Sequence, residues 1–410
     1  MKYFIVNAYG RSNRGDSVLL DECISEVRRF DPSGEISCSL FYGVDDAAAV
    51  YPDINWSLRI GNSTRRGLVG RLETLFYMFI SLLAVFPLLR FLIKLLPIEQ
   101  QNTFKGVLAS DYVISAPGGY IHDTNFSYYV ALVHIYLGVA LNKRVILAPQ
   151  SYGPIRSKFG RLVASFVLSK CDAVCSREGY SHQFLKSTLF LDDGILRRCG
   201  DSAFFNPNEI NTLPDIDDEY QSVLKGSKRI LGLTVVGWNF PHRANPAEDY
   251  HNYLKSFARA IDRLSIDFDL QPIVFNQVDG DRETACKLKD LCAVDVYVDG
   301  VSREPEYLRP LISQSYVFIG TRFHSCIFAM MENVPTMAIS YLPKTEFIMK
   351  DLGFSDRFVD INSVDEGLLY SVVENYLSDI DKAKIDLDAK LCIYRGEFGT
   401  LGSVLRDVRG

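Results

Sequence analysis

Arg322 and His324 lie two residues apart, shortly after the apolar run Tyr316–Ile319 that predicts a strand. If the extended conformation continues, alternate side chains point the same way and the pair faces one ligand. The planar guanidinium of arginine suits bidentate capture of a phosphate or a carboxylate. Histidine titrates near neutral pH and can transfer protons. A hydrogen-bonded structural histidine beside a core strand would give the same pattern, so the surrounding elements must decide.

Strand-like apolar runs alternate with turns and helical patterns along the chain. This alternation predicts an α/β fold with parallel strands and crossover helices, whose ligands bind at the carboxyl ends of the strands. We expect strands at Tyr3–Val6, Tyr112–Ser115, Val145–Ala148, Ala173–Cys175, Ile230–Val236, Pro272–Phe275, Val317–Ile319 and Thr336–Ser340. We expect helices near Ser17–Phe30, Tyr128–Leu141, Lys158–Leu168, Ser181–Leu185 and Tyr250–Leu264, the last capped by Asp249.

The chain has 410 residues, which suggests two domains. A polar, acidic stretch over residues 206–228 resembles a linker followed by a helix. We therefore expect an N-terminal domain over residues 1–205 and a C-terminal domain over residues 206–410 that includes the last helices.

Composition excludes several classes of protein. Hydrophobic residues make up 48% and charged residues 23%, and the formal net charge is −6; a general nucleic-acid binder would carry a basic excess. The nine cysteines are scattered without CxxC spacing, which disfavours a zinc site and fits a reducing cytoplasm. The apolar run near the N-terminus is too short for a signal peptide.

Other candidate ligand residues follow the remaining predicted strands. Each also has a plainer interpretation: Asp16 can cap a helix, the glycines can form a tight turn, and the cations can be solvated surface groups. The first turn is neither a Walker loop nor GxGxxG. The candidates are Asn13, Gly15 and Asp16 in the first turn, Gly118, Gly119, Gln150 and Arg177 further along, and Tyr341 and Lys344 in the second half.

The segment over residues 65–97 differs from the rest of the chain. Residues 75–89 carry no charge, whereas Arg65, Arg66 and Arg71 precede them and Arg90 and Lys94 follow. The uncharged part is short for a spanning helix, which needs about 20 residues, and Pro87 would interrupt it. We expect a membrane-surface element at the cytoplasmic leaflet, peripheral at the inner face of the plasma membrane. A buried helix pair and a true span are the alternatives.

Taken in order, these motifs resemble the polysaccharide pyruvyl transferases of exopolysaccharide, capsule and cell-wall polymer synthesis, and the colanic-acid type in particular. The chain has Pro117-Gly118-Gly119 where many members have three glycines, and the apolar insert is not a general feature of the family. The matching pieces are residues 13–16, 117–119, 150–154, 176–178 with Ser181, 200–201, 320–325 and 335–344.

The resemblance implies a glycosyltransferase-B-like fold, with two Rossmann-like domains and an interdomain cleft. It implies transfer of pyruvate from phosphoenolpyruvate to two hydroxyls of a sugar in a polysaccharide precursor, which forms a cyclic ketal and releases phosphate. The acceptor would bind the N-terminal domain and phosphoenolpyruvate the C-terminal domain. Arg322, His324 and Arg177 carry over as donor-binding residues, and no metal or other cofactor is implied. The apolar segment suggests a lipid-linked oligosaccharide as acceptor.

The mechanistic hypothesis divides the work among these residues. Arg322, Arg177 and Lys344 hold the anion, His324 transfers the proton, and Asp16 or Asp123 orients a sugar hydroxyl. A sugar-nucleotide-dependent glycosyltransferase of the same fold is the main alternative, because fold alone does not decide function. A non-catalytic assembly protein is the third possibility.

Overall fold

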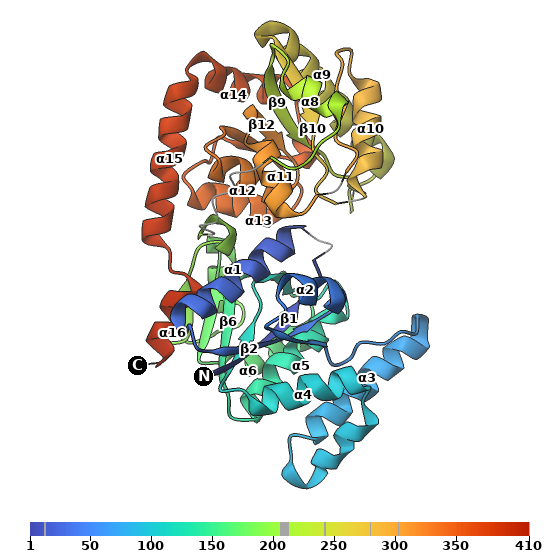
Figure 1. The fold of residues 1–410 in the computed structure, drawn as a ribbon, viewed down its shortest axis with the longest axis vertical. Coiled ribbons are helices and arrows are strands. Elements are labelled where there is room, and N and C mark those ends of the chain that lie inside the picture. Colours follow the sequence, from blue (N-terminus) through green and yellow to red (C-terminus); the bar gives the residue numbers. More distant parts are fainter. Residues whose placement is uncertain (12–13, 206–212, 242, 279, 302, 410) are drawn as a thin grey trace. The chain divides into compact units, whose positions relative to one another are not determined.

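The computed structural model describes residues 1–11, 14–205, 213–241, 243–278, 280–301 and 303–409 (Figure 1). The chain divides into two compact units, Met1–Asn206 with Phe398–Gly410 and Pro207–Glu397. Each unit is built around a sheet of parallel strands covered by helices, so the predicted α/β class is confirmed.

The sheet of the first unit has the order β3-β2-β1-β4-β6-β7-β8, and β5 pairs with β6. Helices cover both faces, and the central strands are accordingly buried and mostly apolar, as is usual for parallel strands. Its strands are β1 (Lys2–Ala8), β2 (Glu35–Leu40), β3 (Asn55–Leu58), β4 (Tyr112–Ser115), β5 (Gly118–Ile121), β6 (Arg144–Tyr152), β7 (Ala173–Ser176) and β8 (Leu196–Arg198).

The helices of the first unit form two hydrophobic layers, one on each face of the sheet. One layer includes α5 and α6, and the other includes α1 and α16. The helices are α1 (Arg14–Phe30), α2 (Val44–Val50), α3 (Gly67–Leu83), η1 (Pro87–Leu95), α4 (Ile98–Ala109), α5 (Ser127–Ala140), α6 (Lys158–Leu168), α7 (Gly179–Ser187), η2 (Ser202–Phe205) and α16 (Leu401–Arg409).

The last helix corrects the expected domain assignment, which placed all of residues 206–410 in the second unit. α16 packs on α1 in the first unit instead. The carboxylate of Glu26 accepts hydrogen bonds from the amide of Gly402 at 2.6 Å and from the hydroxyl of Thr400 at 2.7 Å. Leu401 and Leu405 of α16 are buried in the hydrophobic core cluster that also contains residues of α1. The chain therefore returns to the first unit after Glu397.

The second unit has the strand order β11-β10-β9-β12-β13-β14. Its strands are β9 (Arg229–Thr234), β10 (Leu270–Val274), β11 (Tyr297–Val298), β12 (Ser315–Gly320), β13 (Thr336–Ser340) and β14 (Phe358–Asp360). Its helices are α8 (Asp218–Leu224), α9 (Pro246–Phe268), α10 (Asp281–Leu291), α11 (Pro305–Ile312), α12 (Phe323–Met331), α13 (Pro343–Asp351), η3 (Ile361–Ser363), α14 (Glu366–Ser378) and α15 (Ile380–Glu397).

The start of α9 differs from the prediction that Asp249 caps it. The helix begins at Pro246 with Asn245 in the N-cap position, so Asp249 lies inside the first turn. There its carboxylate accepts hydrogen bonds from Arg243 at 3.0 and 3.2 Å. Proline at the first helical position is favourable because its fixed φ suits the helix.

The apolar segment over residues 65–97 forms α3 and η1. The structure bears on its three interpretations, which are a membrane-surface element, a buried helix pair and a true membrane span. Among the described residues, no helix combines the length and apolarity that crossing a bilayer requires, which contradicts the spanning alternative. Met78 and Ile80 face the core, whereas Leu72, Phe79 and Leu88 are exposed. The segment is therefore only half buried, and its exposed half needs a separate explanation.

Candidate functional site

The junction of β12 and α12 positions the Arg322–His324 pair. The strand ends at Gly320, where a Cβ atom would lie only 2.5 Å from the sulfur of Cys326 and 2.7 Å from the Phe318 ring. Glycine therefore permits the close packing of helix on strand. Arg322 takes the N-cap position of α12 with φ −78° and ψ 117°, and its amide donates to the hydroxyl of Thr234 at 3.3 Å.

This geometry corrects the reason given for pairing Arg322 with His324. The prediction assumed a continuing strand, in which the two side chains would point the same way. Instead Arg322 is extended and His324 lies in the first turn of α12. Both residues belong to the strand–helix junction at the carboxyl edge of the sheet, which is where parallel α/β sheets bind ligands.

Asp281, the first residue of α10, holds the Arg322 side chain. Nε of Arg322 donates to the two carboxylate oxygens at 2.9 and 3.1 Å, and Nη2 donates to Oδ1. Burial alone would lower the pKa of Arg322, but Asp281 and the phenol of Tyr341 outweigh it and the pKa is raised. The Arg322 side chain keeps 21% of its surface exposed, whereas Asp281 keeps 2%. Arg322 is thus a fixed cation with one accessible edge.

Aromatic and basic side chains lie on the elements that follow the same strand ends. His324 is buried, and its ring meets the Phe323 ring edge-on with centroids 5.3 Å apart. Nζ of Lys344, in the first turn of α13, lies 5.5 Å from the centroid of the same Phe323 ring. Tyr341 directly follows β13 and packs against Trp238, centroid to centroid 5.0 Å. We call Trp238, Arg322, His324, Tyr341 and Lys344 the strand-end cluster.

Three polar contacts brace the start of α12 and the residues just before it. The side-chain oxygen of Gln277 accepts from the amide of Ser325 at 3.2 Å and from its hydroxyl at 2.8 Å. The hydroxyl of Thr321 lies 3.0 Å from that of Tyr253. Sequence reasoning missed Gln277, Trp238 and Asp281 as site residues. The available signal was that Trp238 and Gln277 each follow a predicted strand.

Arg177 lies in a different environment from Arg322. Its side chain is 1% exposed, with Nη1 2.8 Å from Asp201 and Nε 3.8 Å from Glu178. Nε also donates to the hydroxyl of Ser151 at 2.8 Å. Burial raises the pKa of Glu178, and Arg177 partly offsets this. The geometry makes Arg177 the centre of a buried ion-pair network in the first unit.

The glycines and Gln150 belong to the same region of the first sheet. Gly118 pairs with Gln150 across β5 and β6. A Cβ atom on Gly119 would contact Nη2 of Arg177 at 3.4 Å, so this glycine leaves room for the buried guanidinium. Gln150 is fully buried and donates to the hydroxyl of Tyr152 at 3.1 Å. Gln150 is therefore enclosed beside Tyr152 and is not exposed at an open edge of the sheet.

Asp16 lies in the first turn of α1, where the helix dipole favours a carboxylate. Gly15, the residue before it, is buried. Asn13 is outside the described residues. Asp123 accepts a hydrogen bond from the amide of Ser157 at 2.7 Å and so fixes the start of α6. Burial raises the pKa of Asp123, but backbone donors outweigh this and the pKa is lowered, which makes it a weak base.

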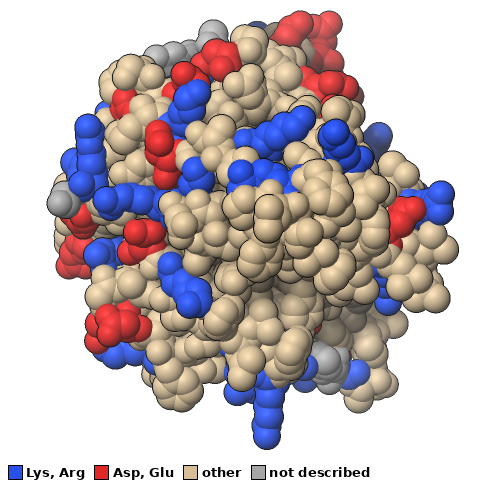
Figure 2. Space-filling view, turned by 90° about the horizontal axis from the view of Figure 1, so that it is seen from below, with Lys and Arg blue, Asp and Glu red and all other residues tan. Residues whose placement is uncertain are grey.

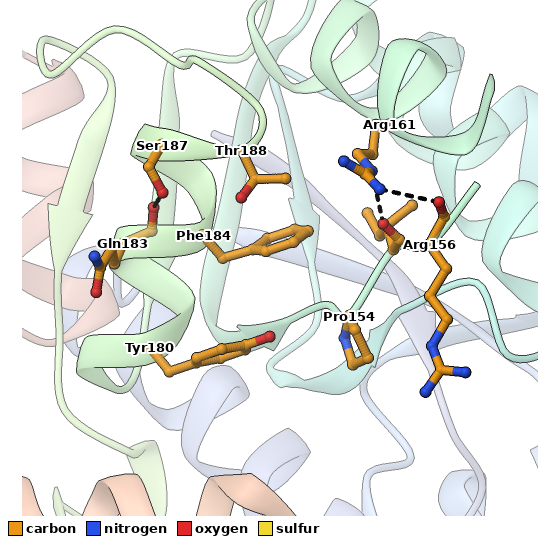
Figure 3. Close-up of a pocket in the computed structure, with 9 residues that line it drawn as sticks. Pro154, Arg156, Arg161, Tyr180, Gln183, Phe184, Ser187 and Thr188 are labelled. Carbon is orange, nitrogen blue, oxygen red and sulfur yellow. Dashed lines mark hydrogen bonds between the residues drawn. The ribbon is translucent and has the colours of Figure 1, made fainter. Parts of the chain in front are cut away.

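A pocket of about 530 Å³ opens in the first unit beyond the carboxyl end of β6. Figure 3 shows the rings of Tyr180 and Phe184 extending from α7 on one side and Arg156 and Arg161 on the other. The guanidinium of Arg161 is held by the carbonyls of Ile155 and Arg156, at 2.9 and 3.0 Å. Stacked rings beside arginines suit a partly polar, ring-shaped ligand.

Comparison with known proteins agrees with this architecture. The profile of the polysaccharide pyruvyl transferase family matches residues 13–343. The amylovoran biosynthesis protein AmsJ of Erwinia amylovora is 23% identical over 259 residues, which are 61% of this chain and 61% of AmsJ. The match thus spans about three fifths of the curated relative.

Solved structures share the fold at low sequence identity. A glycosyltransferase from Rickettsia africae superposes with a TM-score of 0.62 at 10% identity, covering 100% of this chain and 97% of its own. Anabaena HepE in complex with UDP-glucose gives 0.60 at 12%, covering 100% and 98%. The UDP-GlcNAc 2-epimerase of Neisseria meningitidis gives 0.61 at 9%, covering 100% and 99%. The expected glycosyltransferase-B-like fold is confirmed, and the chain belongs to the polysaccharide pyruvyl transferase family.

Proposed function

We propose that this protein transfers pyruvate from phosphoenolpyruvate to two hydroxyls of one sugar in a polysaccharide precursor. The reaction forms a cyclic pyruvate ketal and releases phosphate. The observation that carries the proposal is the strand-end cluster, a fixed arginine with a lysine, a tyrosine and a histidine around it. Membership of the polysaccharide pyruvyl transferase family supports pyruvate transfer as the reaction.

Arg322 suits a donor that carries both a phosphate and a carboxylate. Asp281 occupies the side of the guanidinium formed by Nε and Nη2. The end formed by Nη1 and the second proton of Nη2 is then directed at substrate oxygens, since a guanidinium has five donors in a fixed plane. Lys344 supplies a second positive charge nearby, and Tyr341 a hydroxyl.

His324 is the proposed proton donor. A proton added to the methylene carbon of phosphoenolpyruvate leaves an oxocarbenium-like centre at the neighbouring carbon, which one sugar hydroxyl attacks with loss of its proton. The carbon–oxygen bond to phosphate then breaks. The second hydroxyl adds to the same carbon and loses its proton, which closes the ketal. Arg322 and Lys344 stabilise the phosphate as it leaves.

For the acceptor we propose the pocket between α7 and the start of α6. A sugar ring offers apolar C–H faces to the rings of Tyr180 and Phe184, and hydroxyls to Arg156 and Gln183. A lipid-linked oligosaccharide used at the inner face of the plasma membrane fits the exposed apolar surface of the same unit.

The decisive experiment compares ligands and variants of the purified full chain. Phosphoenolpyruvate should raise the thermal unfolding temperature, and UDP-glucose should not. His324→Ala should lower the rate of phosphate release by roughly 10²–10⁴-fold, because a general acid usually contributes that factor to the rate. Arg322→Lys should abolish the protection by phosphoenolpyruvate, because lysine cannot contact Asp281 and substrate oxygens in one plane.

The matched control is His251→Ala, an exposed histidine on α9 in the same unit, which should leave both measurements unchanged. Wild-type phosphate release by His324→Ala would refute the proton-transfer role. Protection by UDP-glucose in place of phosphoenolpyruvate would instead support a sugar-nucleotide-dependent glycosyltransferase.

A further inference from the structure

The outer side of α3 and η1 carries an unusual number of exposed apolar side chains. α3 buries Met78, Ile80 and Ser81 against the first unit. None of the residues of η1 is buried, and Leu88 at its start is 90% exposed. The exposed apolar residues of this segment are Leu68, Val69, Leu72, Leu75, Phe76, Phe79, Phe86, Leu88, Phe91, Leu95 and Ile98.

A second segment, far away in the sequence, adds to this surface. α6 buries Ala164 and Val167 but exposes Phe159, Leu162 and Phe166. α3 and α6 both pack against α5, and all belong to the core cluster on one face of the sheet. We call the exposed apolar residues of α3, η1 and α6 the docking face. The view from below shows a broad uncharged area whose edges carry mainly lysines and arginines, together with some acidic side chains (Figure 2).

The charges within the two segments of the docking face are mostly positive. Residues 65–97 contain five lysines and arginines and one acid, Glu73. That acid is neutralised by Arg65, with 3.1 Å between Nε and Oε1. Residues 156–170 contain four lysines and arginines and no acid, although the whole chain has a net charge of −6. Positive charge is therefore concentrated where the apolar side chains are exposed.

This combination distinguishes among possible occupants of the docking face. A second copy of the chain would bring the same positive charges against each other, which costs binding energy. An anionic bilayer offers apolar chains to the exposed leucines and phenylalanines and phosphate groups to the surrounding cations. The two signals together give stable attachment where either alone is marginal.

We propose that the first unit binds anionic lipid bilayers through the docking face, which lies in the interfacial region without crossing the membrane. Phe159, Leu162 and Phe166 of α6 take part together with α3 and η1. This inference does not depend on the reaction. If the proposed function also holds, the acceptor pocket, whose Arg156 and Arg161 flank the start of α6, lies beside the lipid surface.

The test is co-sedimentation of the full chain, without substrates, with vesicles of phosphatidylglycerol and phosphatidylethanolamine or of phosphatidylcholine alone. The wild type should bind the vesicles with phosphatidylglycerol at least about tenfold more tightly than the vesicles of phosphatidylcholine alone. Raised salt should weaken the binding to the phosphatidylglycerol vesicles. Leu88→Glu/Phe91→Glu and Leu162→Glu/Phe166→Glu should each reduce binding by about tenfold or more. The control Ile385→Glu/Ile393→Glu makes the same change at exposed positions of α15 and should bind normally.

A second measurement avoids dependence on charged substitutions. In Phe91→Trp, brominated lipids should quench the introduced tryptophan, and in Ile385→Trp they should not. Absence of binding to phosphatidylglycerol vesicles, or equal binding to both vesicle types, would overturn the proposal. So would a dimer in light scattering that Leu88→Glu/Phe91→Glu converts to a monomer, because the docking face would then be a contact between copies. Phosphate release is measured separately, so failure of this proposal leaves the proposed reaction standing.

Discussion

Asp281 fixes the guanidinium of Arg322, and its replacement by asparagine tests whether that placement matters. Asparagine keeps the shape of the side chain but removes its charge and one acceptor oxygen. The substitution weakens the hydrogen bonds that Arg322 donates to Asp281, from Nε at 2.9 and 3.1 Å and from Nη2. Asp281 does not face the donor in the proposed mechanism, so it acts by positioning Arg322.

The size of the effect follows from the burial of the pair. Breaking a buried ion pair from one side costs roughly 3–5 kcal/mol, and exposed pairs contribute far less. Because the Arg322 side chain keeps 21% of its surface exposed, water screens part of the lost interaction. We therefore expect Asp281→Asn to lower the free energy of unfolding by about 2 kcal/mol.

The catalytic effect should exceed what this loss of stability explains. A misplaced Arg322 guanidinium loses about one charge-assisted hydrogen bond to phosphoenolpyruvate, which contributes roughly 1.5–3 kcal/mol. Since about 1.4 kcal/mol corresponds to a tenfold change in rate, kcat/KM for phosphoenolpyruvate should fall roughly 10- to 100-fold. Phosphate release at varied phosphoenolpyruvate measures this, and urea denaturation measures the stability.

The chain offers a matched control for the same substitution chemistry. Glu332 ends α12, the helix that Arg322 begins, and pairs with Nε of Arg309. Glu332→Gln should also reduce stability but leave kcat/KM unchanged. If Asp281→Asn is folded and retains wild-type kcat/KM, or if the two variants lose activity equally, the positioning argument is refuted.

Three further changes test the packing, the pH dependence and the buried network. Gly320→Ala would bring a Cβ atom to 2.5 Å from the sulfur of Cys326. Thermal denaturation should therefore show that the free energy of unfolding falls by roughly 1–3 kcal/mol. The control Gly396→Ala adds a Cβ atom in open space and should leave stability unchanged or raise it. Burial raises the pKa of Glu22 to about 8, above its ordinary 4.5, despite Arg29. The unfolding free energy should therefore fall as pH rises between those values, and Glu22→Gln should flatten the dependence in urea titrations. Arg177→Met should cost roughly 3–5 kcal/mol of stability because two buried carboxylates lose their cationic partner. A variant of unchanged stability that loses only protection by phosphoenolpyruvate would instead make Arg177 a donor ligand.

Elements with strong local signals were predictable from the sequence. β4, β13 and α6 begin and end at the predicted residues, because an apolar run or helical pattern is bounded by turn-forming residues. β2 and β3 were missed, since their polar serines interrupt the apolar pattern. Periodicity carries little information where a strand tolerates small polar residues in its buried positions.

The supports of the site depend on contacts between distant parts of the chain. Asp281 and Arg322 are 41 residues apart, and the strand order β10-β9-β12 brings them together. Nothing in the residues around either one indicates that order. The same holds for α16, whose apolar stripe indicates that it packs on something but not that α1 is the partner.

Arg177 and Arg322 illustrate why a strand-end arginine is not by itself a substrate site. Both lie between a buried strand and the helix that follows it, so their local sequences support the same prediction. Arg177 is 1% exposed with two carboxylates within 4 Å, and its charge is compensated inside the protein. Arg322 has one carboxylate on one side of its guanidinium and keeps an exposed edge beside Lys344 and Tyr341. Of these two arginines, Arg322 is therefore the one whose guanidinium keeps surface that an anion from solution can contact.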